Sequence, residues 1–285
     1  MRYLILSLLY LIAVLPFPII YFISSLIYLF LRYLVGYRKE IILANLQQAF
    51  PDKTIKEIRG IMNLFYKNYI DVFLESVKLL TMKRTRLKKM IQFKENPAYS
   101  KLFNEESGAI ILTGHRGNFE LAGQILSLVL PHAFYGAYKP FKSKTFEFIW
   151  HKIRHKFDMK YIPVRQVSRF LIQHAKEGLY MAFLNDQAPT GDQQCWVHFL
   201  NKDALFFTGP EKLAQKLKMP VYFMDMIRIS RGTYEIRVEE ITTKNNAEYP
   251  LTKEYVHLLE EAILKKPDGW LWSHRRWKHE RMLKR

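Results

Sequence analysis

The chain has 285 residues, of which 49% are apolar, and a chain of this size and composition can bury one substantial α/β core. It carries 44 Lys and Arg against 26 Asp and Glu, so its net charge of +18 favours an anionic partner such as nucleic acid, a phospholipid surface or an acidic protein. The single cysteine, Cys195, excludes an intramolecular disulfide and suits a domain that faces the reducing cytosol.

Residues 1–35 predict a membrane anchor. Residues 3–31 contain no charged side chain, and these 29 positions exceed the roughly 20 that an α-helix needs to cross a bilayer. Pro16 and Pro18 interrupt the segment, which favours a kinked span or two half-helices within one leaflet. A cleaved signal peptide is the competing interpretation, but no small-x-small site follows the first apolar stretch.

Basic residues flank this segment unequally, because Arg2 precedes it whereas Arg32, Arg38 and Lys39 follow it. By the positive-inside rule, residues 36–285 are expected on the cytoplasmic side of the inner membrane. They are predicted to form one α/β domain, which begins with helices over 39–50 and 54–80. A mixed basic and apolar segment over 81–94 then suits either an amphipathic helix on an anionic membrane or a solvated basic face.

From residue 108 onward, short apolar runs alternate with helical patterns, which indicates an α/β fold. The expected strands are 109–113, 133–138, 160–164, 179–184, 221–227 and 233–238. The expected helices are 119–130, 144–156, 167–177, 210–217 and 253–265. Because the last two strands are close enough for a hairpin, we expect a mixed sheet layered with helices.

The segment AIILTGHRGNFELA, residues 109–122, combines a buried strand, a glycine-rich turn and a helix that begins at residue 118 or 119. An imidazole beside a carboxylate can take a proton from a hydroxyl near neutral pH. We therefore expect His115 to act as general base and Glu120, in the first turn of the helix, to hold its far nitrogen. The alternative is a histidine that only hydrogen-bonds at a strand end.

The nucleophile is expected to be a substrate hydroxyl, because the chain has no Gly-x-Ser-x-Gly elbow. Several polar residues follow predicted strands or open the predicted helix, where ligands of α/β folds bind. The substrate-binding candidates are Arg116, Asn118, Arg165, Asp186 and Gln187. Simple turn chemistry is an equal alternative for Asp186. No metal site is predicted, since the spacing differs from the His-Glu-x-x-His of zinc proteases.

The same segment resembles the His-x4-Asp/Glu motif of glycerolipid-type acyltransferases. Its surroundings resemble the late acyltransferases of lipid A biosynthesis, the lauroyl/myristoyl transferase group, and the resemblance covers nearly the whole chain. Four further segments carry it: RKEIILANLQQAFPD (38–52), LNDQAP (184–189), FFTGPEKLAQKLKMPV (206–221) and PDGWLWSHRRWK (267–278).

The resemblance implies a glycerolipid-acyltransferase-like fold and an O-acyltransferase without a cofactor. It implies acyl carrier protein as thioester donor and a hydroxyl of a phosphorylated glycolipid, a lipid A precursor, as acceptor. An amino-lipid, a lysophospholipid or a specialised-metabolite hydroxyl is the alternative acceptor. A nucleic-acid-binding protein would explain the charge but not the uncharged opening, so no nucleic acid is expected. A membrane scaffold would leave His115 and Glu120 without a role.

Overall fold

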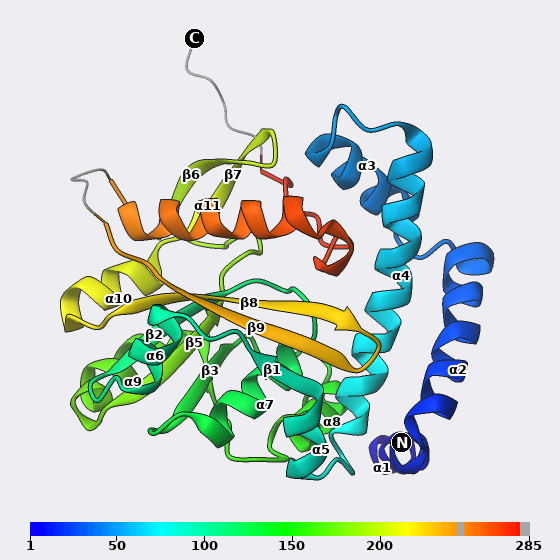
Figure 1. Cartoon of the computed structure of the whole chain (residues 1–285), viewed down its shortest axis with the longest axis horizontal. Helices are drawn as coiled ribbons and strands as arrows, with labels where there is room; N and C mark the ends of the chain where they lie inside the picture. Colours follow the sequence, from blue (N-terminus) through cyan, green and yellow to red (C-terminus); the bar gives the residue numbers. More distant parts are fainter. Residues whose placement is uncertain (244–247, 280–285) are drawn as a thin grey trace.

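The structure is a computed structural model that describes residues 1–243 and 248–279. Within these residues, seven strands form one sheet in the order β1-β9-β8-β2-β5-β3-β4 (Figure 1). Their bounds are β1 (Ile91–Phe93), β2 (Gly108–Thr113), β3 (Phe134–Tyr138), β4 (Lys160–Pro163), β5 (Leu179–Leu184), β8 (Val221–Ser230) and β9 (Thr233–Glu240). Neighbouring strands are parallel except β8 and β9, which form an antiparallel hairpin. The predicted mixed sheet is therefore confirmed.

Helices cover both faces of this sheet. Each helix that the hydrophobic periodicity predicts is present, with bounds close to the predicted ones. The long helix is α4 (Ile55–Lys78), whose first turn is closed by a capping box between Thr54 and Glu57. The others after the N-terminal segment are α3 (Lys39–Ala49), α5 (Arg84–Met90), α6 (Pro97–Phe103), α7 (Phe119–Val129), α8 (Lys144–Arg154), α9 (Val164–His174), α10 (Gly209–Leu217) and α11 (Pro250–Lys265).

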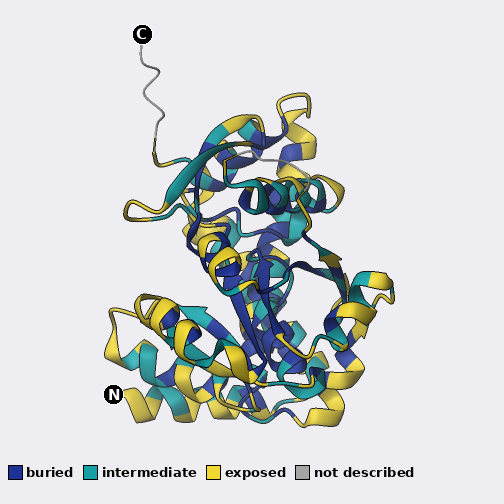
Figure 2. Ribbon diagram, turned by 90° about the vertical axis from the view of Figure 1, so that its left-hand side faces the viewer, coloured by how far each residue is buried: buried dark blue, intermediate teal, exposed yellow. Residues whose placement is uncertain are grey.

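Two hydrophobic cores lie on opposite faces of the sheet, and strand β2 shows why. Its side chains alternate, so Ile110 and Leu112 enter one core while Ala109 and Ile111 enter the other. Helices α9, α10 and α11 pack into the first core, and α5, α7 and α8 into the second. Figure 2 shows the strands as the most buried layer of the molecule. A parallel strand covered on both faces is expected to be apolar throughout.

Four elements were not expected from the sequence: β1, α6, and the strands β6 (Gln194–Phe199) and β7 (Lys202–Phe207), which form a hairpin. The segment over 81–94 also differs from its first interpretation. Its apolar residues Met82, Leu87 and Met90 are buried in the protein core rather than presented to a membrane. Its basic residues face solvent, which is the second of the two interpretations considered.

The N-terminal segment forms α1 (Arg2–Val14), α2 (Phe17–Leu29) and a π-helical turn (Phe30–Val35), with the break between α1 and α2 at Pro16. Among the described residues, Phe17–Val35 is the one helix with the length and composition of a membrane span. Large apolar side chains on α1 and α2 are exposed, including Leu8, Phe22 and Leu26. A contiguous exposed apolar surface is typical of a site that contacts a membrane or another protein. Helix α2 runs alongside α4 (Figure 1).

Candidate functional site

Strand register brings two distant segments together at the carboxyl edge of the sheet. Strands β2 and β5 are parallel neighbours, and Thr113 at the end of β2 pairs with Leu184 at the end of β5. The ladder continues one residue further, since the Asn185 N–H donates to the Thr113 carbonyl. One more step places His115 opposite Asp186. Parallel strands thus deliver both residues to the edge where ligands of α/β sheets bind.

Asp186 contacts His115 at two points. Its Oδ1 lies 2.5 Å from the imidazole Nδ1, and its Oδ2 accepts the His115 backbone N–H at 2.7 Å. The Trp270 indole N–H donates to the same Oδ2 at 2.8 Å. Burial raises the pKa of Asp186, but the His115 charge and these hydrogen bonds outweigh burial and lower the pKa to about 2. Asp186 is therefore an ionised partner that fixes Nδ1 as the protonated nitrogen.

A turn at Gly117 separates His115 from helix α7. Gly117 has φ +54°, and a Cβ there would stand 2.3 Å from the Met226 carbonyl oxygen. Its N–H donates to the Gly269 carbonyl, so the turn is tied to the C-terminal segment that supplies Trp270. Only a glycine fits this combination of left-handed backbone and close approach.

The other imidazole nitrogen, Nε2, is contacted by one exposed side chain. The side-chain amide nitrogen of Gln187 lies 3.3 Å from it, and Gln187 is exposed. His115 lines a cavity of about 290 Å³, a size near the lower end of small-molecule sites. The structure thus brings Asp186 and Gln187, two of the substrate-binding candidates, into contact with His115 at one edge of the sheet.

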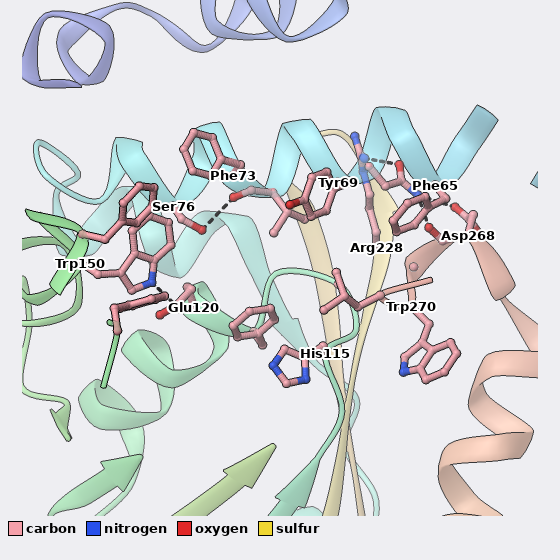
Figure 3. A pocket seen from close by; sticks show the side chains of 18 residues that line it. Phe65, Tyr69, Phe73, Ser76, His115, Glu120, Trp150, Arg228, Asp268 and Trp270 are labelled. Carbon is pink, nitrogen blue, oxygen red and sulfur yellow. Dashed lines mark hydrogen bonds between the residues drawn. The ribbon is translucent and has the colours of Figure 1, made fainter. Parts of the chain in front are cut away.

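The cavity runs between α4 and the sheet edge and is mostly apolar. Figure 3 shows Trp150 and Glu120 at one end, Arg228 and Asp268 at the other, and His115 between them. Its apolar wall consists of Phe65, Tyr69, Val72 and Phe73 from α4 with Phe119, Phe141, Phe146 and Trp150. An apolar cavity of this kind, with a base at its middle, suits a ligand that has a hydrocarbon part and one reacting polar group.

Glu120 does not contact the histidine as expected. Its carboxylate accepts the Trp150 indole N–H at 2.9 Å and pairs with Arg154 at 2.6 Å. Although burial acts in the opposite sense, the charge of Glu120 raises the pKa of Arg154. The predicted pairing of His115 with Glu120 is therefore wrong, and Asp186 takes that place. Glu120 instead lines the cavity and holds its α8 wall.

Two other predicted substrate-binding residues are occupied inside the protein. Arg116 is buried and forms an ion pair with Asp225 at 2.7 Å. Asn118 is fully buried, caps helix α7 and donates to Glu75 at 3.0 Å. Neither side chain lines the cavity, so direct substrate binding by them is contradicted. Both instead fix the turn that carries His115.

Arg165 lies outside the site. It stands exposed in the first turn of α9, after β4, at the edge of the sheet. Strand β4 is three positions from β2 in the sheet, which is about 14 Å at the ordinary strand spacing. Arg165 does not line the cavity, so its predicted place near the reacting groups is wrong.

The α4 wall, Trp270 and Arg228 were not predicted as site residues. The first two lie in patterned segments, the long periodic helix over 54–80 and the tryptophan-rich segment 267–278, but neither pattern says what it faces. Within residues 1–243 and 248–279, no three His, Cys, Asp or Glu side chains are grouped as metal ligands would be.

A family model described as bacterial lipid A biosynthesis acyltransferase matches residues 1–279, which is nearly the whole chain. No individual protein of curated function matches the sequence. The chain belongs to this family and is an acyltransferase of lipid A biosynthesis, and the family implies an acyl donor and a lipid A precursor as acceptor.

Proposed function

We propose that this member of the lipid A acyltransferase family transfers a fatty acyl chain from an acyl carrier protein thioester to a hydroxyl of a phosphorylated lipid A precursor. The observation that carries the proposal is the pair of His115 and ionised Asp186 at the middle of an apolar cavity. The reaction takes place at the cytoplasmic face of the inner membrane, with residues 1–35 as anchor and residues 36–285 as catalytic domain.

His115 acts as the general base. With Nδ1–H held by Asp186, Nε2 accepts the proton of the substrate hydroxyl while the hydroxyl oxygen attacks the thioester carbonyl carbon. The C–S bond then breaks, an ester C–O bond remains, and the imidazolium returns the proton to the leaving thiolate. Asp186 stabilises the imidazolium between these steps. Base catalysis of this kind is worth about 10² to 10⁴ in rate.

Gln187 is the proposed donor to the oxyanion. Two nearby donors are occupied within the protein: Arg116 pairs with Asp225, and the Gly117 N–H donates to the Gly269 carbonyl. The Gln187 amide lies beside Nε2 and is exposed, so its N–H can turn to a developing negative charge on the substrate. Removal of one such donor typically costs about 10² to 10³ in rate.

The apolar end of the cavity is proposed to hold the acyl chain. Phe73 stacks on Trp150 with ring centroids 5.9 Å apart, and Phe141 packs against the edge of the same indole. Glu120 fixes Trp150 and Arg154, so its proposed contribution to catalysis is to hold this wall. Exposed lysines flank Phe141 at positions 139, 142 and 144, and they favour an acidic carrier protein as donor.

Acyl transfer in mixed micelles tests the function. Purified protein is incubated with acyl-loaded carrier protein and a lipid A precursor, and mass spectrometry measures the gain of one acyl mass. We expect that gain with the native protein and its loss with His115→Ala. Lysophospholipid and amino-lipid acceptors tested in parallel address the alternative acceptors, and acyl coenzyme A addresses the donor. Transfer only to one of those other acceptors would overturn the lipid A assignment.

A further inference from the structure

A second cavity, of about 350 Å³, lies between α2, α4 and the β8–β9 turn. It adjoins the cavity of His115, because Asn68 and Arg228 line both. Nothing in the reaction described above uses it. Its position between the predicted membrane span and the catalytic domain makes it accessible to a molecule that resides in the membrane.

The cavity carries an excess of positive charge. Lys67, Arg228 and Arg231 line it, and the one carboxylate among its lining residues is Asp71. Asp71 is fully buried and pairs with Arg228 at 2.6 Å and with Arg231 at 2.9 Å. One carboxylate therefore serves two guanidinium groups. Lys67 lies over the Tyr28 ring at 5.2 Å, a contact that leaves its positive charge uncompensated.

The rim of this cavity is apolar. Leu29 on α2 and Leu64 on α4 line it, and about half of each side chain is exposed. A cationic interior with an exposed apolar rim matches an amphiphile that carries a phosphate group. Lys67 and Arg231 offer a phosphate charge-assisted hydrogen bonds, which are about twice as strong as neutral ones.

We propose that this second cavity binds a phosphate group of the acceptor lipid through Lys67 and Arg231, and so presents the acceptor hydroxyl to His115 through the shared wall of Asn68 and Arg228. This inference rests on the proposed function. The same chemistry would also suit the phosphate of a bulk phospholipid, which the experiment distinguishes. Arg228 is the positioning residue between the two cavities, since it is held by Asp71 and Asn68.

The test compares a phosphorylated lipid A precursor with the same precursor after phosphatase treatment. Lys67→Ala is the main variant, because this exposed lysine can be truncated without opening the core. Lys67→Glu adds a charge reversal. Lys56→Ala is the matched control, an exposed lysine on the same helix that lines neither cavity. Transfer kinetics are measured in neutral mixed micelles, with and without phosphatidylglycerol.

We expect Lys67→Ala to raise the KM for the phosphorylated acceptor about three- to tenfold and to leave kcat within about twofold. Lys67→Glu should raise it further, and Lys56→Ala should not change it. The KM for the dephosphorylated acceptor should be equal in all four proteins. An equal effect of Lys67→Ala on both acceptors would overturn the proposal. So would an effect confined to inhibition by phosphatidylglycerol, which would assign the cavity to bulk phospholipid.

A binding measurement separates this inference from the proposed function. His115→Ala, which cannot turn over, is titrated with both precursors, alone and combined with Lys67→Ala. If the phosphorylated precursor binds more tightly than the dephosphorylated one and Lys67→Ala abolishes this difference, phosphate binding in the second cavity is supported even where no transfer is detected. Transfer without that preference retains the function and removes the phosphate site.

Discussion

Asp186 holds both the side chain and the backbone of His115, with Oδ1 at 2.5 Å from Nδ1 and Oδ2 at 2.7 Å from the amide nitrogen. The first contact sets the tautomer of the imidazole. The second fixes the backbone position from which the imidazole extends. A single carboxylate therefore controls the orientation and the proton position of the proposed base. The Trp270 indole N–H and the paired ends of β2 and β5 in turn hold the carboxylate.

Replacing Asp186 by asparagine should lower kcat by about 10² to 10⁴ while the KM for both substrates changes little. The amide can hydrogen-bond to Nδ1 in the wrong sense and cannot stabilise an imidazolium. The pH dependence of kcat separates this effect from a folding defect. A variant that only folds poorly should keep the pH dependence of the native enzyme, whereas loss of the partner of the base should change it. A native profile with a lower plateau would make Asp186 a purely structural residue.

The low pKa of Asp186 also predicts acid sensitivity. Its pKa falls from 3.8 to about 2 in the folded protein, so the carboxylate stabilises the fold above pH 3.8. That contribution, about 2 kcal/mol, is lost as the pH falls from 3.8 through 2. Unfolding by denaturant in detergent should show this loss in the native protein and less of it in Asp186→Asn. Parallel pH dependences of the two proteins would contradict the assignment.

Glu120→Gln should act on the cavity wall rather than on the base. It leaves Arg154, whose side chain is 16% exposed, without its partner, and breaking such a pair costs about 3 to 5 kcal/mol. We expect lower thermal stability, an about tenfold lower kcat/KM for long-chain donors and an unchanged pH profile of kcat. Arg154→Gln and the double variant complete a cycle, in which non-additive stability would confirm the pair.

The two carboxylates, Asp186 and Glu120, show what can and cannot be predicted from the sequence. Periodicity and turn residues located β2, β5, α7 and the edge where His115 lies, because each signal is local. Which carboxylate meets the histidine depends on how β2 and β5 align, and this register is a long-range property. Once the two strands are paired with Thr113 opposite Leu184, the contact of His115 with Asp186 follows.

The same limit explains the errors at Arg116 and Arg165. Both positions follow a strand, and the sequence places them correctly there. Because β4 lies at the edge of the sheet, Arg165 is distant from His115 at the end of β2. The Arg116 side chain pairs with Asp225 on the neighbouring β8. Strand order and partner choice decide the outcome, and neither can be read from one strand alone.

Gly117→Ala should damage the site through the backbone. A side chain at φ +54° costs about 1 to 3 kcal/mol, and the added Cβ would displace the Met226 carbonyl. We expect a lower unfolding temperature and a loss of transfer larger than the loss of stability explains. Gly60→Ala is the matched control, since its Cβ meets nothing within 4 Å in helix α4 and should stabilise the protein by about 0.5 to 1 kcal/mol. Equal activities of the two variants would show that the turn tolerates a side chain.

Ser24→Ala should reveal whether the N-terminal helices are part of the folded domain. The Ser24 hydroxyl donates to the buried Asp71 at 2.5 Å, and the Tyr21 hydroxyl donates to the buried Glu75 at 2.9 Å. Loss of a hydrogen bond to a buried carboxylate costs about 1 to 3 kcal/mol. We therefore expect Ser24→Ala to lower the unfolding temperature in detergent, whereas Ser7→Ala, on the exposed side of α1, should leave it unchanged.

Deletion of residues 1–35 should lower stability and transfer more than Ser24→Ala does. It would uncover the face of α4 that packs against α1 and α2 and would leave the carboxylates of Asp71 and Glu75 short of donors. Because Asp71 also pairs with Arg228, the deletion should disturb the wall between the two cavities and reduce transfer even to detergent-solubilised acceptor. Thermal unfolding and transfer are measured on the same preparations. A truncated chain with native stability and native activity on solubilised acceptor would show that residues 1–35 serve as a separate anchor, independent of the catalytic domain.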